Sequence, residues 1–181
     1  MRFHLCLVLC CLAFSVHATQ MIPLPVEDLT RRADLVLKGH VMTTTCLKDR
    51  EGRIYTRIEF KVDEVWKGSL NTNQFVIVQG GGTVGNERLQ VVGEASYETG
   101  EELVSFLRLN PMGEGVSIGL AQGKFNLWKD ETTGEVYAHN LFHGKTKAQA
   151  AIQPAISSNS ISTRSLLKLT ELHDRVKGGL Q

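Results

Sequence analysis

The chain has 181 residues, of which 42% are hydrophobic and 22% charged, and its formal net charge is +1. This length suits one domain with a single core, and no second domain is needed. The near-neutral charge offers no electrostatic footprint for nucleic acid or anionic lipid, so neither is expected as a partner.

Residues 1–18 have the composition of an export signal. Arg2 and His4 form a short basic start, and an apolar run from Leu5 to Val16 leads to a small-residue cleavage site before Thr19. The run is too short to span a bilayer, so no membrane insertion is expected after signal removal. The sequence therefore predicts an exported protein, periplasmic or extracellular.

The cysteines lie mostly in that signal. A lipoprotein anchored through Cys10 or Cys11 is an alternative to cleavage, although the residue before each is not small. After cleavage Cys46 alone remains, so no internal disulfide is possible and the fold must depend on its core. Cys46 is expected to be a half-buried residue at a strand end, with a reactive or intermolecular thiol as the alternative.

A short helix is predicted from Pro25 to about Ala33, because its first turn is acidic and its last turn basic, which complements the helix dipole. The first strand is predicted over Leu35–Thr45, with Gly39 where a barrel strand would bend. Ile54–Gly68 alternates apolar and charged residues and predicts a long, half-buried strand. The alternation slips near Asp63 and Glu64, which predicts a β-bulge there.

Further short strands are predicted between turn residues, over Gln74–Gln79, Leu89–Val92, Glu101–Leu109, Val116–Leu120, Lys124–Lys129 and Glu135–Leu141. Residues 144–161 are rich in Ala, Gln, Ser and Lys and predict a flexible linker. Ser162 is expected to cap a closing helix that ends near residue 178. The predicted class is mainly β: a closed antiparallel barrel within residues 19–143, with an open sandwich as the alternative.

Three motifs invite a functional interpretation. Gly80-x-Gly82-x-x-Gly85 matches a dinucleotide fingerprint, but the residues after it are patterned as a strand and not as the helix that such a site requires. His139 and His143 have the spacing of two zinc ligands, but no third ligand or catalytic Glu lies nearby in sequence. His40 and Cys46 are about 20 Å apart on an extended strand and cannot form a catalytic pair.

Two tryptophans, Trp66 and Trp128, each lie beside a lysine at a strand end. They are expected to pack against the core or its rim, and an exposed binding surface is the alternative.

Parts of the chain resemble a known superfamily. The segments Ala33–Val41, Phe60–Val62, Val65–Gly68 and Gly100–Leu103 resemble the barrel strands of netrin-like domains and tissue inhibitors of metalloproteinases. This resemblance implies an OB-type barrel. Those inhibitors chelate the zinc of their target with an N-terminal cysteine, whereas Thr19 is the expected first residue here, so this wedge does not carry over. Gly119–Phe125 is similar to a segment of uncharacterised exported bacterial proteins.

The leading functional expectation is an exported, non-catalytic module that recognises a protein or peptide, without a cofactor; inhibition of a secreted protease is its sharper form. The loop Gly80, Gly81, Gly82, Thr83, Val84, Gly85 and Asn86 is the expected contact site, because glycine-rich loops on a rigid barrel are suited to recognition. The alternative is a metal-binding protein or hydrolase that uses His139 and His143, with His40 or Cys46 as further candidates.

Overall fold

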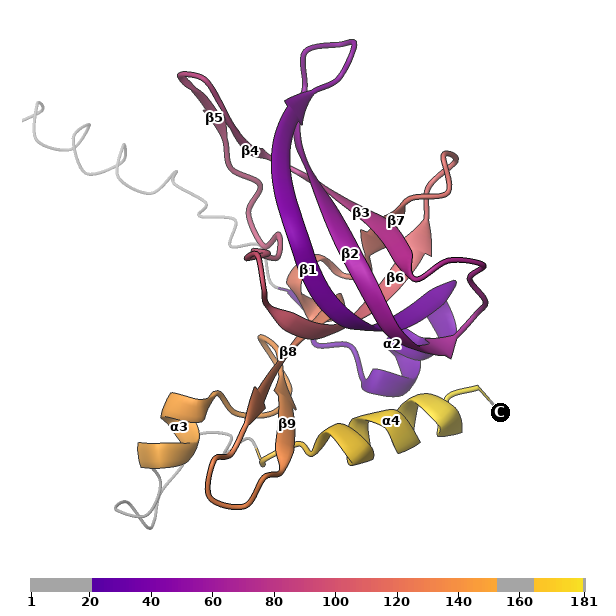
Figure 1. The fold of residues 1–181 in the computed structure, drawn as a ribbon, viewed down its shortest axis with the longest axis vertical. Helices are drawn as coiled ribbons and strands as arrows, with labels where there is room; N and C mark the ends of the chain where they lie inside the picture. The colour runs from indigo at the N-terminus through magenta and orange to yellow at the C-terminus, as the bar shows by residue number, and fades with distance from the viewer. Residues whose placement is uncertain (1–20, 153–164, 181) are drawn as a thin grey trace, which may run out of the picture.

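The structure is a computed structural model that describes residues 21–152 and 165–180. These residues confirm a mainly β fold, with a seven-stranded sheet, a two-stranded hairpin and short helices (Figure 1). The predicted signal, residues 1–18, lies outside the described residues. None of the described helices is long and apolar enough to cross a membrane.

The sheet is built on a long antiparallel hairpin of β1 (Leu35–Lys48) and β2 (Ile54–Lys67). Its strand order is β1-β2-β3-β7-β6-β8-β9, and β1 also pairs with β6. All pairs are antiparallel except β3 and β7, which make one parallel contact. The other strands are β3 (Gln74–Gly80), β6 (Glu102–Leu109), β7 (Gly115–Ser117), β8 (Lys124–Lys129) and β9 (Val136–His139).

The predicted bulge in β2 is confirmed. Pairing with β1 passes from Glu64 directly to Val62, which leaves Asp63 as the extra residue. Gly39 lies opposite this point, and a Cβ atom on it would come within 2.0 Å of the Lys61 carbonyl oxygen. Glycine is therefore required where the two strands bend together.

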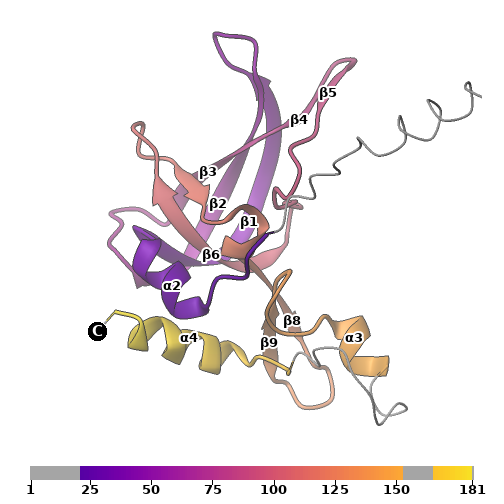
Figure 2. The same cartoon turned by 180° about the vertical axis from the view of Figure 1, so that it is seen from behind.

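Two hydrophobic clusters lie on opposite faces of β1 and β6, because alternate residues of a strand point to opposite sides. The inner core includes Leu37 of β1 and Phe60 of β2. The helix-side core includes Val36 and Phe106, covered by α2 (Val26–Arg32) and α4 (Leu169–Gly178). The two helices run side by side beneath the sheet (Figures 1 and 2).

An ion pair joins these helices. Arg175 Nε lies 2.8 Å from Glu27 Oε1, and Arg175 Nη2 lies 3.0 Å from Glu27 Oε2. This two-point geometry fixes the relative direction of the two side chains as well as their distance.

The segment after β3 differs from the prediction. Instead of a loop followed by a strand over Leu89–Val92, the chain forms a hairpin of β4 (Gly82–Val84) and β5 (Glu87–Leu89). Gly85, with φ +59°, supplies the first residue of its two-residue turn. The predicted strand is wrong beyond Leu89, because a turn closed by the Glu94 N–H and the Val91 carbonyl bends the chain away.

The predicted strand over Val116–Leu120 is also too long. β7 ends at Ser117, and the backbone then takes positive φ at Gly119 (+62°) and Leu120 (+61°). A 3-10 helix follows, η2 (Leu120–Gly123). Leu120 is the one non-glycine residue with positive φ in the described part of the chain, a conformation that most side chains disfavour.

The predicted linker contains a helix, α3 (Lys147–Ile152). Thr146 and Gln149 cap it reciprocally: Thr146 Oγ1 accepts from the Gln149 N–H at 3.1 Å, and Gln149 Oε1 accepts from the Thr146 N–H at 3.0 Å. Thr-x-x-Gln was the sequence signal for this capping box. Residues 153–161 of the linker lie outside the described residues.

The closing helix begins at Leu169, later than the prediction from Ser162, which itself lies outside the described residues. The residues just before it are extended because they pair with β9. The Ala138 N–H donates to the Leu167 carbonyl at 2.8 Å, and Lys168 forms an isolated antiparallel β-bridge with Tyr137.

Candidate functional site

A groove of about 1040 Å³ extends from the β1–β2 loop, at the end of the sheet away from α2 and α4, to the β6–β7 loop. Four segments distant in sequence form it: the β1–β2 loop, the end of β3, the chain around β5, and the β6–β7 loop. Its apolar lining is Ile54, Tyr55, Val78, Leu89, Met112 and Val116. Met112 is 78% exposed and Leu89 44% exposed, so the groove presents apolar side chains to solvent.

The β1–β2 loop is held in shape by one carboxylate. Asp49 Oδ1 accepts the N–H groups of Glu51 and Arg53 at 3.0 and 2.8 Å, and Asp49 Oδ2 accepts from Arg53 Nε at 2.6 Å. A backbone hydrogen bond from Asp49 to Arg53 closes the same turn. The loop is therefore a preformed wall of the groove.

The β6–β7 loop is held in the same way by an amide. Asn110 Oδ1 accepts the N–H groups of Met112 and Glu114, both at 2.9 Å, and its Nδ2 donates to Glu114 Oε2 at 2.9 Å. This network projects Met112 outward from a fixed turn. Local hydrogen bonds thus fix the conformation of both loops. A ligand in the groove would lose less conformational entropy of the protein than if the loops had to become ordered.

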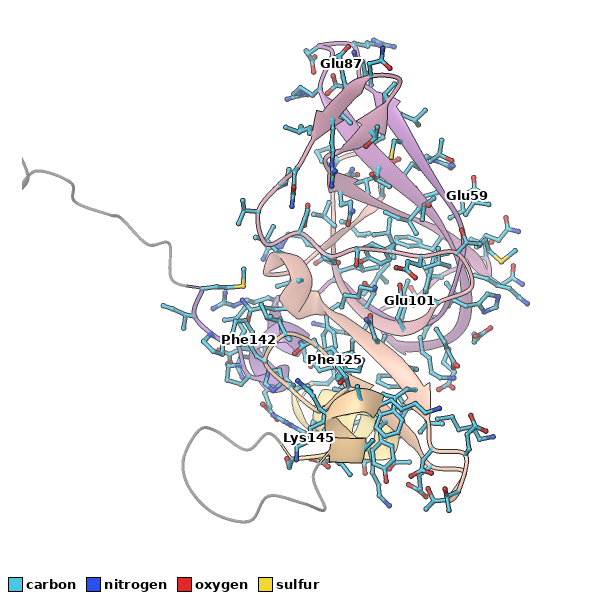
Figure 3. All side chains as sticks on the ribbon, turned by 90° about the vertical axis from the view of Figure 1, so that its left-hand side faces the viewer. Glu59, Glu87, Glu101, Phe125, Phe142 and Lys145 are labelled. Atoms are coloured by element: carbon cyan, nitrogen blue, oxygen red, sulfur yellow. The ribbon has the colours of Figure 1, made fainter. Side chains whose placement is uncertain are left out.

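The charges that line the groove nearly cancel, with one acidic residue in excess. Three basic and four acidic residues line it, and several pair at its rim. Lys48 Nζ lies 2.5 Å from Glu87 Oε1, and Arg53 bonds both Asp49 and Glu51. Figure 3 shows Glu87 at the end of the molecule away from Phe125 and Lys145. A groove with this balance lacks the basic track that a phosphate backbone needs.

One acid of the groove is half-buried. Glu94 Oε1 accepts the Gly80 N–H at 3.1 Å, which satisfies a backbone donor at the end of β3. Burial raises the pKa of Glu94, and its hydrogen bonds with the backbone of Gly80 and Ala95 oppose that rise. Glu94 thus couples the floor of the groove to the chain that follows β5.

The structure separates the seven residues predicted as the contact site. Gly80 lines the groove, and the Gly81 N–H donates to the Ile54 carbonyl at 3.0 Å. Gly82, Thr83 and Val84 form β4, and Gly85 and Asn86 form the hairpin turn. Gly82 packs closely: a Cβ atom there would lie 2.7 Å from Cys46 Sγ and 2.8 Å from Thr56 Oγ1. The absence of a side chain at Gly82 therefore allows β4 to pack against β1 and β2.

Cys46 of β1 lies against Gly82 of β4. Its Sγ lies 3.5 Å from Thr56 Oγ1, and its hydrogen bonds with Thr56 and with the backbone of Thr83 lower the pKa of the thiol. The side chain is half-buried, as the sequence predicted. His40 is on the same strand but is directed to Asp63, with Nδ1 3.4 Å from Oδ2.

The two histidines considered as metal ligands are placed around the end of β9. His143 Nε2 lies 2.8 Å from the Leu24 carbonyl oxygen, to which it must donate, and the ring stacks on Phe125 at 5.8 Å between centroids. His139 lies in β9 opposite Asn126. Among residues 21–152 and 165–180, no group of three or more His, Cys, Asp or Glu side chains is arranged to hold a metal ion.

Gln122 joins His143 in holding the N-terminal segment, a role that the sequence reasoning missed. Gln122 Oε1 accepts the Leu24 N–H at 2.8 Å, and Gln122 Nε2 donates to the Ile22 carbonyl at 3.3 Å. Its amide thus pairs with the backbone of Ile22–Leu24 as a neighbouring strand would. The segment Gly119–Phe125 was singled out in the sequence, but nothing in it indicated this partner.

A buried polar cluster lies between β6 and β8. Lys124 Nζ lies 2.6 Å from Glu101 Oε2, bonds the Ser96 carbonyl and sits 4.8 Å from the Tyr97 ring centre. Ser105 is the cross-strand neighbour of Lys124, and burial lowers the pKa of that lysine. Serine and lysine together could activate a nucleophile, but Ser105 is fully buried and out of reach of a substrate.

Both tryptophans are used in packing. Trp66 meets His173 edge to face at 4.7 Å, and its Nε1 donates to Glu64 Oε2 at 2.9 Å. Trp128 stacks on Tyr137 at 4.8 Å and donates to the Lys145 carbonyl at 2.9 Å. This supports the packing role over an exposed binding surface.

No protein-family model matches this chain, and no curated protein matches it in sequence.

Proposed function

We propose that this protein is an exported, non-catalytic binding module that holds an extended segment of a protein or peptide in the groove. The observation that carries the proposal is the groove itself. It is a large open cavity between two loops that are each held by internal hydrogen bonds, and apolar side chains are exposed along it. Such a surface is suited to the apolar side chains of an extended peptide.

The strand pairing supports an OB-like barrel as the frame. Pairings lead from β1 through β2, β3, β7 and β6 back to β1, with β3 and β7 parallel. In OB-folds the face of the second and third strands, with the loop between strands 1 and 2 and the loop between strands 4 and 5, is the usual ligand site. The groove uses the corresponding face and loops here, since β6 and β7 take the places of strands 4 and 5.

A peptide fits the groove better than the oligonucleotides that many OB-folds bind. The lining residues carry no excess of positive charge, so counterion release would contribute little to binding. Tyr55 is the one aromatic side chain among the lining residues, whereas stacking platforms for bases use several. The exposed apolar side chains of Leu89, Met112 and Val116 favour hydrophobic side chains as the bound groups.

The proposal retains two expectations from the sequence. The apolar run before Thr19 supports export, and the resemblance to netrin-like inhibitors supports inhibition of a secreted protease as the sharper form of the function. Inhibition would act through the two hydrogen-bonded loops of the groove, because an N-terminal cysteine wedge is absent from the expected mature sequence. A panel of secreted metallo-, serine and cysteine proteases assayed with the protein tests that form.

Selection of peptides on the immobilised protein, from Thr19 to Gln181, tests the central claim. Selected peptides should bind the wild type, and Leu89→Asp should weaken binding by at least about tenfold, because a carboxylate would face the apolar side chain of the peptide. Met42→Asp is the matched control, since Met42 is also 44% exposed but lies outside the groove. Failure to select any peptide, or equal losses in both variants, would contradict the proposal.

A further inference from the structure

A second, smaller pocket adjoins the groove. It has a volume of about 460 Å³, and Asn110 and Val116 line both cavities. Two arginines line it, Arg32 at the end of α2 and Arg108 near the end of β6, and Leu109 and Ile118 contribute apolar surface. The pocket therefore combines positive charge with an apolar wall at one end of the groove.

Both arginines are unpaired. Within residues 21–152 and 165–180, neither guanidinium has an ion-pair or hydrogen-bond partner. By contrast, four other arginines of the described chain each bind a carboxylate, namely Arg31, Arg53, Arg57 and Arg175. Arg50 and Arg88 of the described chain also lack such a partner but lie outside this pocket, so Arg32 and Arg108 are distinguished by lining one cavity together.

Asp34 is an acidic residue that lies beside the pocket and offsets part of its positive charge. Asp34 Oδ2 accepts the Leu109 N–H at 2.8 Å, so this carboxylate is directed to the backbone beside the pocket. Two guanidinium groups and one carboxylate leave a local excess of one positive charge. That excess matches a single carboxylate better than a phosphate dianion.

We propose that the Arg32–Arg108 pocket binds a carboxylate attached to an apolar group. In a peptide that occupies the groove, this would be the C-terminal carboxylate or an acidic side chain. The peptide part rests on the proposed function, whereas the pocket itself can be tested without any peptide. Guanidinium groups donate paired hydrogen bonds to a carboxylate, and the wall formed by Leu109, Val116 and Ile118 would cover the apolar body.

The test uses N-acetyl-leucine as the probe and N-acetyl-leucinamide as its neutral analogue. With ¹⁵N-labelled protein, the carboxylate should cause saturable shifts in the backbone signals of residues 108–119, and the amide should not. Arg32→Gln and Arg108→Gln should each weaken binding by about tenfold, the loss of one charge-assisted interaction. Arg88→Gln is the control, because Arg88 is exposed in β5 and lies outside both cavities.

Several results would overturn the pocket assignment: no saturable shifts, equal shifts with the amide, tighter binding of inorganic phosphate, or an equal loss in the Arg88 control. If N-acetyl-leucine binds as expected while peptide selection fails, the pocket stands and the proposed function falls. If peptides bind the groove but the probe does not bind, the function stands and the pocket assignment falls.

A groove-binding peptide then distinguishes the two sources of carboxylate. Loss of affinity on amidation of its C-terminus assigns the terminal carboxylate, and loss on replacement of an acidic side chain by its amide assigns that side chain. Retained affinity in both cases would contradict the extension of this site to peptides.

Discussion

The two ends of the β1–β2 hairpin are made from the same pair of strands but have opposite surroundings. Toward α2 and α4, both faces of β1 are buried: Val36 lies in the helix-side core and Leu37 in the inner core. Toward the groove, β1 is exposed from Met42 to Thr45, and the β4–β5 hairpin covers one face near Cys46. Burial on both faces holds the first end together, and local hydrogen bonds hold the second.

This difference separates a part of the molecule that is buried on both faces from a part whose apolar side chains stay exposed. Toward the helices both faces of the sheet are covered by hydrophobic clusters, whereas the groove exposes Leu89 and Met112. The loops whose backbone is hydrogen-bonded to the side chains of Asp49 and Asn110 keep their conformation while apolar side chains beside them stay exposed. Substitutions at the two ends should therefore have unequal effects on the free energy of unfolding.

The largest expected contrast is between Phe106→Ala and Leu89→Ala. Phe106 is fully buried in the helix-side core, and its loss should lower the free energy of unfolding by about 3–5 kcal/mol. Leu89 is 44% exposed in the groove, and its loss should cost less than about 0.5 kcal/mol. Urea denaturation at pH 7 measures both. A cost at Leu89 equal to that at Phe106 would show that the groove is part of the core.

A smaller effect is expected at the ion pair between the helices. Glu27→Gln should lower stability at pH 7 by about 1 kcal/mol, a value reduced by solvent screening because both side chains are about one-third exposed. The hydrogen bond from Arg175 lowers the pKa of Glu27 below its ordinary value of 4.5, although burial opposes this. The contribution is therefore present above pH 4.5 and is lost as the pH falls through the lowered pKa.

The measurement is the difference in unfolding free energy between wild type and Glu27→Gln across pH 3 to pH 7, about the range in which carboxyl groups titrate. Glu131→Gln is the control, since Glu131 and Lys147 are 3.9 Å apart and largely exposed. An equal loss in the control, or a difference that does not shrink in acid, would contradict a specific role for the Glu27–Arg175 pair.

The smallest expected effect has the opposite pH dependence. Burial raises the pKa of Glu94, so the wild type loses stability as the pH rises through that value. Glu94→Gln keeps an oxygen acceptor for the Gly80 N–H but cannot ionise. It should therefore be more stable than wild type at pH 7 by a few tenths of a kcal/mol, with the advantage fading in acid. A variant that is less stable than wild type at pH 7 would contradict this account.

Sequence periodicity predicted the frame well, for physical reasons. The alternation in Ile54–Gly68 reflects a strand with one face buried, and its slip at Asp63 corresponds to the bulge in the structure. The errors lie where local hydrogen bonds decide the conformation. The Thr146–Gln149 capping box starts a helix in a polar segment, and the pairing of Leu167 with β9 delays α4.

The candidate site was harder to predict because the residues that form it are distant in sequence. Ile54, Val78, Leu89 and Met112 meet only through the topology of the sheet, and no spacing in the chain signals their proximity. Arg32 and Arg108 likewise lie on α2 and β6 and share a pocket through tertiary contact. Of the glycine run that the sequence singled out, Gly80 alone lines the groove.

The position of Cys46 makes the thiol a natural reporter for the hairpin above it. Its sulfur is held between Thr56 and the backbone of Thr83, and it is the single cysteine of the expected mature chain. The thiol is half-buried and Gly82 of β4 lies against it, so its alkylation rate should change when the contact between β4 and β1 changes. A ligand that fastens the hairpin would slow the alkylation, and one that displaces the hairpin would speed it.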